Sequence, residues 1–204
     1  MSDLLHYSAV LLIFSPTFVL GLRHSVPTAF ISASLLSALA FIPIYDVSTV
    51  LRLKGLFADL SLTTLALLIL WPTLRMNRIS LNNPDSASLC AIVLLLAVTL
   101  YPMALGVGPY DPYTLGFRPL ALLTAIAALG VLATLRGYLV SRTIVLVVLV
   151  GYWLRVLDSQ NLWDYLIDPI LGIFAVIYLL KYSLLKYSLR NGKLSSSVDI
   201  SRSA

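Results

Sequence analysis

Seven long apolar runs, separated by short polar or proline-containing breaks, limit what this chain can fold into. They cover roughly residues 5–22, 28–44, 55–71, 89–105, 119–135, 139–157 and 165–182. Each has about 17–20 residues, close to the length with which an α-helix crosses the hydrocarbon of a bilayer. The sequence therefore predicts an all-α integral membrane protein with about seven transmembrane helices. Pro16 and Pro43 shorten the first two runs, so six spans is the alternative if these two form a shallow hairpin.

Composition supports lipid as the main solvent. Charged residues make up 11% of the chain, whereas a soluble domain carries about 25%. Its single cysteine, Cys90, lies in an apolar run and excludes an intramolecular disulfide and a cysteine-ligated zinc or iron–sulfur centre. We expect one transmembrane domain over residues 1–182 and a basic, serine-rich cytoplasmic tail over 183–204, disordered at its end.

The basic residues indicate an orientation. With seven spans and the C-terminus inside, ten of the fourteen bases fall on the cytoplasmic side. These are Arg23, Arg75, Arg78, Arg136, Arg142, Lys181, Lys186, Arg190, Lys193 and Arg202. The other four are Arg52, Lys54, Arg118 and Arg155. This positive-inside bias predicts the N-terminus outside and the C-terminus inside, so the net charge of +5 calls for no nucleic-acid partner.

In this topology three unusual segments, residues 43–54, 106–118 and 155–168, share the outer face. All three contain aromatic and acidic side chains, and the first two also contain proline. We expect them to converge into one polar, aromatic rim, where multi-spanning proteins often bind a ligand. The tryptophans and tyrosines are also typical of an aromatic belt at a membrane interface.

Acidic residues of the rim are the candidates for chemistry. Asp111, Asp158 and Asp164 are the candidate catalytic acids, and Asp111, Asp164 and Asp168 the candidate ligands of a divalent cation. Carboxylate oxygens would suit magnesium or calcium. The alternative is structural, because Asp168 precedes Pro169 as a helix cap would, and Asp111 lies in a proline-rich turn.

Other rim residues are candidates for contact with a ligand or anion: Arg155, Arg118, Asn161, Tyr110, Tyr113 and Trp163. Arg155 suits phosphate, because its guanidinium offers several donors. Arg155 and Asp158 are also spaced to pair across one helical turn. Asp59 is the candidate intramembrane acid, since ionisable groups at membrane depth usually face the bundle interior.

Helix packing has its own signal in the second run. Ala29, Ala33 and Ser37 recur every four residues. Small side chains at this spacing let helix backbones approach closely in lipid. We therefore expect this face to pack against the first run.

The sequence contains no HExxH, GxSxG or Walker A pattern. We therefore expect a non-catalytic accessory or binding subunit of the bacterial inner membrane. It would work at the periplasmic face with envelope lipids, or with another membrane or periplasmic protein such as an envelope enzyme. One alternative is an intramembrane enzyme that acts on a lipid head group through the acids. The second is a small transporter with Asp59 as its coupling acid. No cofactor is expected beyond the divalent cation.

Overall fold

The computed structural model describes residues 2–44, 47–57, 60–77 and 84–202. Its α-helices are α1 (Ser2–Gly21), α2 (Val26–Leu39), α3 (Thr49–Phe57), α4 (Leu62–Met76), α5 (Pro84–Ala104), α6 (Leu120–Leu135), α7 (Leu139–Trp153), α8 (Leu162–Leu166) and α9 (Pro169–Arg202). A 3-10 helix, η1 (Pro112–Gly116), and a two-stranded antiparallel hairpin of β1 (Pro43–Ile44) and β2 (Val47–Ser48) complete the described elements. The prediction of an all-α protein is confirmed.

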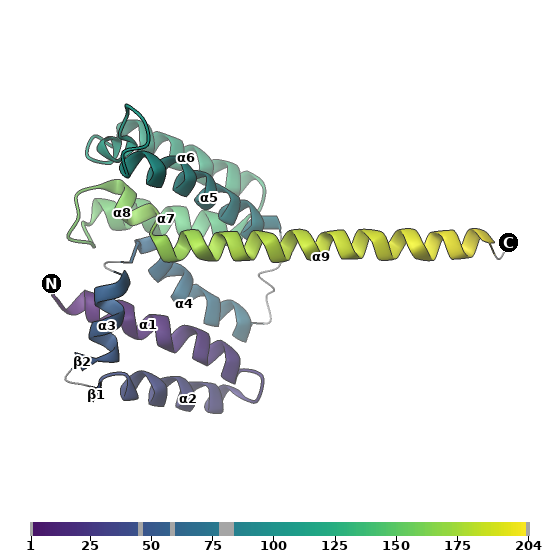
Figure 1. The fold of residues 1–204 in the computed structure, drawn as a ribbon, viewed down its shortest axis with the longest axis horizontal. Coiled ribbons are helices and arrows are strands. Elements are labelled where there is room, and N and C mark those ends of the chain that lie inside the picture. Colours follow the sequence, from purple (N-terminus) through teal and green to yellow (C-terminus); the bar gives the residue numbers. More distant parts are fainter. Residues whose placement is uncertain (1, 45–46, 58–59, 78–83, 203–204) are drawn as a thin grey trace.

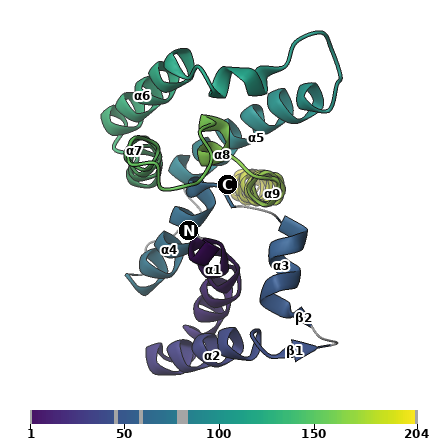
Figure 2. The ribbon, with the colours of Figure 1, turned by 90° about the vertical axis from the view of Figure 1, so that its left-hand side faces the viewer.

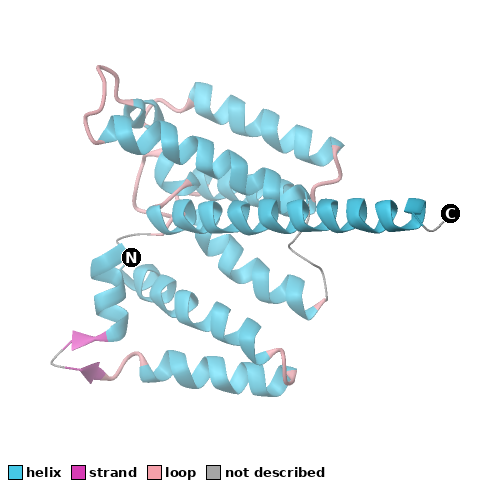
Figure 3. Ribbon diagram, turned by 45° about the vertical axis from the view of Figure 1, so that its right-hand side comes forward, coloured by secondary structure: helices cyan, strands magenta, loops and turns pink. Residues whose placement is uncertain are grey.

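The long helices run back and forth, so their connections gather at two ends of the molecule (Figures 1 and 3). We call one end the rim end; it holds the β-hairpin, α3, the loop with η1, and α8 with its flanking loops. The other we call the basic end, since Arg23, His24, Arg75, Arg136 and Arg142 lie there. The three unusual segments that the sequence singled out thus lie at the same end.

Among the described residues, two helical segments are long and apolar enough to cross a membrane. They are Pro84–Ala104, which is α5, and Pro169–Ser188 of α9. Five shorter apolar helical segments of 10–17 residues accompany them: Val10–Gly21, Val26–Leu39, Leu62–Met76, Leu120–Leu135 and Leu139–Trp153. At 1.5 Å per residue a 15-residue helix is about 22 Å long, less than the ~30 Å of hydrocarbon. Helix length and composition thus allow two membrane spans, and such helices also occur in soluble proteins.

The main hydrophobic core lies among α4, α5, α7, α8 and α9. Small residues bring α5 and α9 together, because the position of a Cβ on Gly172 would be 3.7 Å from the side chain of Ala97. Tyr165 and Leu162 of the short α8 are fully buried in this core. The core therefore anchors the rim end to the long helices.

Helices α1 and α2 form a hairpin at one side of the molecule (Figure 1), and α1 joins it to the rest by packing against α4. Ala29, Ala33 and Ser37 are all buried, which confirms the predicted packing face. Where the helices meet, a Cβ on Gly21 would lie 2.5 Å from the Cα of Ala29. Only glycine permits so close an approach of the two backbones.

Several predicted boundaries are wrong. The run expected over 55–71 is broken before Leu62, and α4 then continues through Pro72 to Met76. Pro72 removes one hydrogen bond of the helix, but the two flanking turns stay paired. The helix expected to reach residue 157 ends at Trp153. At the C-terminus the expected disordered end is instead helical, since α9 continues to Arg202.

Candidate functional site

The rim end is built by side chains of the α7–α8 connection that hold the loop containing η1. Asn161 is fully buried, and its Nδ2 donates to the carbonyl oxygen of Tyr113 over 3.0 Å. Its Oδ1 accepts from the backbone nitrogen of Trp163 and so caps α8. The indole nitrogen of Trp163 donates to the carbonyl oxygen of Pro112 over 2.9 Å. These contacts fix two loops, about 50 residues apart in sequence, as one unit.

Close approach of the loops requires Gly116. A Cβ at this position would lie 1.6 Å from Oδ1 of Asn161 and 2.7 Å from the ring of Trp163. Neither side chain has room to move, because both are buried. Glycine at 116 is thus needed to seat η1 against α8.

Asp164 is the centre of a hydroxyl network in the same unit. The phenol of Tyr113 donates to both carboxylate oxygens at 3.1 Å, and the hydroxyl of Ser159 donates to Oδ2. Burial and the neighbouring Asp164 carboxylate raise the pKa of Tyr113 above its usual value. Tyr113 therefore stays protonated and able to donate at neutral pH. Asp164 satisfies both of its oxygens within the loop unit.

Tyr165 closes the loop that follows α7. Its hydroxyl accepts from the backbone nitrogen of Leu157 over 3.1 Å and donates to the carbonyl oxygen of the same residue over 3.0 Å. Its ring packs edge-on against Tyr152, with the centroids 5.2 Å apart. Residues 154–160 are thereby held over the end of α7.

Beside this loop lies a hollow, which we call the rim hollow, of about 510 Å³. It is lined by Phe117, Leu123, Leu149, Tyr152, Trp153, Arg155, Ser159, Gln160 and Tyr165. Among these lining residues Arg155 is the charged one, and four of the other eight are aromatic. Such a lining combines apolar area with one cation, as sites for amphiphilic anions do.

Arg155 stands in a backbone position where glycine is usual. Helix α7 ends in a Schellman motif, in which Val156 N donates to Gly151 O over 3.0 Å and Arg155 N to Tyr152 O over 3.1 Å. The residue at C′ of this motif is left-handed, and Arg155 has φ of 53°. Helices α5 and α6 end in the same hydrogen-bond pattern, and there the left-handed residues are Gly106 and Gly137. Among the described residues, no other non-glycine residue has a positive φ.

The pairing expected between Arg155 and Asp158 across a helical turn is not formed in this way. Both follow the end of α7, so the one-turn spacing does not apply, and both side chains are exposed. Arg155 instead contributes to the rim hollow.

Asp168 has a structural role that sequence reasoning found only in part. Its Oδ1 accepts from the backbone nitrogen of Leu171 over 2.9 Å, so the predicted cap of α9 is confirmed. Its Oδ2 also accepts from Ser61 N at 2.9 Å, Ser61 Oγ at 2.7 Å and Thr64 Oγ1 at 2.5 Å. One buried carboxylate thus joins the first turns of α4 and α9.

A second buried carboxylate acts in the same manner at the basic end, and no sequence pattern indicated it. Asp85, in the first turn of α5, accepts from Val140 N at 2.7 Å, Ser141 N at 3.1 Å and Ser141 Oγ at 2.5 Å. It therefore caps α7, whose own N-cap residue makes no side-chain hydrogen bond.

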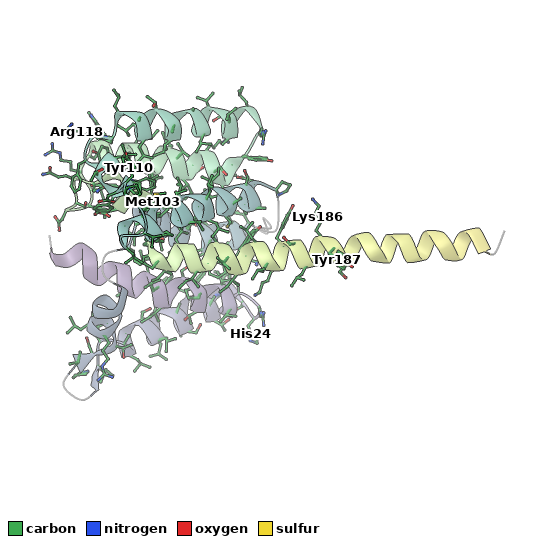
Figure 4. All side chains as sticks on the ribbon, turned by 45° about the horizontal axis from the view of Figure 1, so that its top comes forward. His24, Met103, Tyr110, Arg118, Lys186 and Tyr187 are labelled. Atoms are coloured by element: carbon green, nitrogen blue, oxygen red, sulfur yellow. The ribbon has the colours of Figure 1, made fainter. Side chains whose placement is uncertain are left out.

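Three of the remaining candidates, Tyr110, Asp111 and Arg118, lie in the loop that contains η1. Asp111 Oδ1 accepts from Tyr113 N and caps η1. Arg118 and Tyr110 are exposed at the rim end (Figure 4) and outside the lining of the rim hollow. Asp59 lies outside the described residues.

Of the candidate cation ligands, Asp111 and Asp164 accept from different atoms of Tyr113, whereas Asp168 binds the first turns of α4 and α9. In the part of the chain that the structure describes, no three His, Cys, Asp or Glu side chains are grouped so as to hold a metal ion. These carboxylates instead accept hydrogen bonds that fix loops and helix ends.

Comparison with known proteins yields no relative: no protein-family model, curated protein or solved structure matches the chain.

Proposed function

We propose that the chain is a non-catalytic, seven-span protein of the bacterial inner membrane, which binds the anionic head group of an envelope lipid in the rim hollow at its periplasmic face. The observation that carries this proposal is Arg155, held left-handed beside an aromatic wall. A left-handed non-glycine residue costs about 1–2 kcal/mol. Such strain is tolerated mainly where it serves a site. The guanidinium is a good donor to phosphate oxygens.

Exposure of the long helices supports a lipid environment. Only 22% of the 18-residue apolar stretch of α5, and 17% of that of α9, is buried. A core helix of a soluble protein buries most of such a stretch, whereas here Leu95 is 64% and Ile173 61% exposed. Large apolar area of this kind is rarely left to water. Local thinning of the bilayer and snorkelling of the flanking residues would accommodate the shorter helices.

Orientation follows from charge. Arg75, Arg136 and Arg142 gather at the basic end, and α9 carries Lys181 and Lys186 beyond it. Basic residues favour the cytoplasmic side. The rim end would then face the periplasm, where Arg155 would contact lipid head groups at the membrane edge. The protein partner would be an envelope enzyme that acts on the same lipids.

Thermal unfolding of the purified chain in detergent tests this function. Dihexanoyl phosphatidylglycerol should raise the melting temperature more than dihexanoyl phosphatidylcholine, because a ligand that binds only the folded state stabilises it. Glycerol phosphate, which has the anion but no acyl chain, should act more weakly, because the aromatic wall then has no apolar partner.

Arg155→Gln should reduce the preference for phosphatidylglycerol, and Arg142→Gln, a control at the opposite end, should retain it in full. An equal response of the unmodified chain to the two lipids would refute the proposal. An unchanged preference in Arg155→Gln would also refute it.

A further inference from the structure

Helix α6 leaves a second hollow on the side of the molecule. It packs closely on α7, since a Cβ on Gly130 would lie 2.8 Å from Cγ1 of Val145. Against α5 it makes few contacts along its length, and Figure 2 shows the two helices separated and joined through the loop with η1. We call the space between α5, α6 and α7 the α6 groove; its volume is about 150 Å³.

The residues that line the α6 groove change from polar to aliphatic along its length. Ser88, Arg136 and Tyr138 line it at the basic end. Deeper along α5 and α6 its walls are aliphatic, among them Ile92, Leu96 and Ile126. Thr63, at the far end, donates its hydroxyl to the carbonyl oxygen of Tyr165. The groove is thus apolar except at one end, where a cation stands.

Charge at the polar end favours an anion. Arg136 is exposed at the C-terminus of α6, where a carbonyl-rich helix end holds cations well. Asp85 is the acid that packs nearby, and its carboxylate oxygens already accept hydrogen bonds from the backbone of α7 and the hydroxyl of Ser141. The guanidinium of Arg136 is therefore the group available to a ligand at this end.

The length of the groove matches the depth of one lipid leaflet. From Arg136 to Ile126 along α6 is ten residues, or about 15 Å at 1.5 Å per residue. That is half of the ~30 Å hydrocarbon thickness, the depth of one leaflet. A peptide would leave its backbone polar groups unpaired against these aliphatic walls, which is costly.

We propose that the α6 groove binds an anionic phospholipid of the leaflet at the basic end, with an acyl chain between α5 and α6 and the phosphate on Arg136. This inference rests on the proposed membrane location, but it concerns a different site, lipid leaflet and arginine from the rim hollow. The bound lipid would fill the gap that separates α6 from α5.

Photolabelling of the full chain in phosphatidylcholine vesicles tests the proposal. One sample contains a trace of phosphatidylglycerol with a diazirine on its acyl chain, and a parallel sample contains phosphatidylcholine with the same diazirine chain. After irradiation, mass spectrometry locates the adducts. Adducts on the exposed residues Leu95 and Val98 of α5 serve as the internal reference for insertion.

Phosphatidylglycerol should label Ile92 and Leu129 in the groove severalfold more than phosphatidylcholine does, relative to that reference. Ala133→Phe, at a buried groove position, should reduce groove labelling severalfold, whereas Ala128→Phe, on the exposed face of α6, should not. Arg136→Gln should make the two lipids equal, and Arg23→Gln, an exposed arginine elsewhere at the basic end, should keep the difference.

Equal labelling by the two lipids in the unmodified chain would overturn the proposal, as would unchanged groove labelling in Ala133→Phe. If Leu95 and Val98 are labelled but the groove is not, only this inference fails. If neither is labelled, the chain does not insert, and the proposed function fails with it. Should Ala133→Phe not fold, the Arg136→Gln result decides.

Discussion

Oδ2 of Asp168 lies 2.9 Å from the backbone nitrogen of Ser61, a residue 107 positions earlier in the chain. The same carboxylate caps α9 through its Oδ1, so one side chain sets the start of two helices. Because Ser61 is fully buried, its donors have no access to water if the carboxylate is lost. This contact ties the N-terminal half of the chain to the helix that follows the rim.

Removing the carboxylate should be strongly destabilising. We expect Asp168→Ala to lower the free energy of unfolding by about 2–4 kcal/mol, combining a lost helix cap with buried donors left unpaired. Asp158→Ala, at an exposed position of the same rim, should change it by less than about 0.5 kcal/mol. Chemical unfolding in detergent, followed by circular dichroism, measures both. Equal effects would contradict the assigned role.

Asp85 offers an independent test at the opposite end. Asp85→Ala should cost about 2–4 kcal/mol for the same reasons, because the backbone nitrogens of Val140 and Ser141 are buried. Its effect should add to that of Asp168→Ala, since the two carboxylates share no hydrogen-bond partner. The double variant, unfolded under the same conditions, would reveal any coupling, and a strong coupling would mean that the two ends do not unfold independently.

The left-handed backbone of Arg155 should lower the stability of the fold, while its side chain contributes to lipid binding. Arg155→Gly is expected to raise the free energy of unfolding by about 1 kcal/mol, because glycine adopts the left-handed conformation without strain. Gly137→Ala, at the equivalent position of α6, should lower it by about 1 kcal/mol. Thermal unfolding without lipid compares the two, and Arg155→Gly should at the same time show a reduced preference for phosphatidylglycerol. A destabilised Arg155→Gly would show that the side chain has a structural role instead.

Gly116→Ala tests the fit between η1 and α8. The added methyl group overlaps Oδ1 of Asn161, so we expect a loss of about 1–3 kcal/mol, typical of overpacking. Gly55→Ala, where nothing lies within 4 Å of the new Cβ, is the matched control and should be neutral or slightly stabilising. Limited proteolysis of residues 105–118 gives a local measurement, and faster cleavage is expected only in Gly116→Ala.

Alkaline pH should weaken the hydrogen bonds between Tyr113 and Asp164. The pKa of Tyr113 is raised in the folded chain, so the folded state holds the phenol proton more tightly than the unfolded state. This contribution is fully present below the ordinary tyrosine pKa of about 10 and is lost as the pH rises through the folded value. Between pH 8 and pH 11, Tyr113→Phe should therefore lose less stability than the unmodified chain. Parallel curves would contradict the shift.

Cysteine labelling in cells tests the orientation. In a Cys90→Ala background, Val107→Cys lies in an exposed loop of the rim end and His24→Cys at the basic end (Figure 4 labels His24). A membrane-impermeant maleimide should label Val107→Cys in intact cells and His24→Cys only after permeabilisation. The reverse result would mean that the chain has the opposite orientation. Labelling of both positions in intact cells would contradict the proposed topology.

The amino-acid sequence alone determined where the long apolar helices lie and one face by which they pack. Apolar runs about as long as a membrane span identified the long helices. A helix with so few charges is favourable only in a protein core or in lipid. The spacing of Ala29, Ala33 and Ser37 identified the α1–α2 contact, and Asp168 before Pro169 identified a cap. These are local signals, encoded within a few turns of helix.

Tertiary structure decided the contacts that build the rim. Asp168 reaches Ser61, and Asn161 reaches Tyr113, across 107 and 48 residues, so no periodicity or spacing in the sequence brings them together. The left-handed Arg155 was equally hidden, since Leu-Arg-Val contains none of the glycine that marks the ends of α5 and α6. Local patterns fix each helix, whereas the partner of a buried polar group depends on which helix ends are packed side by side.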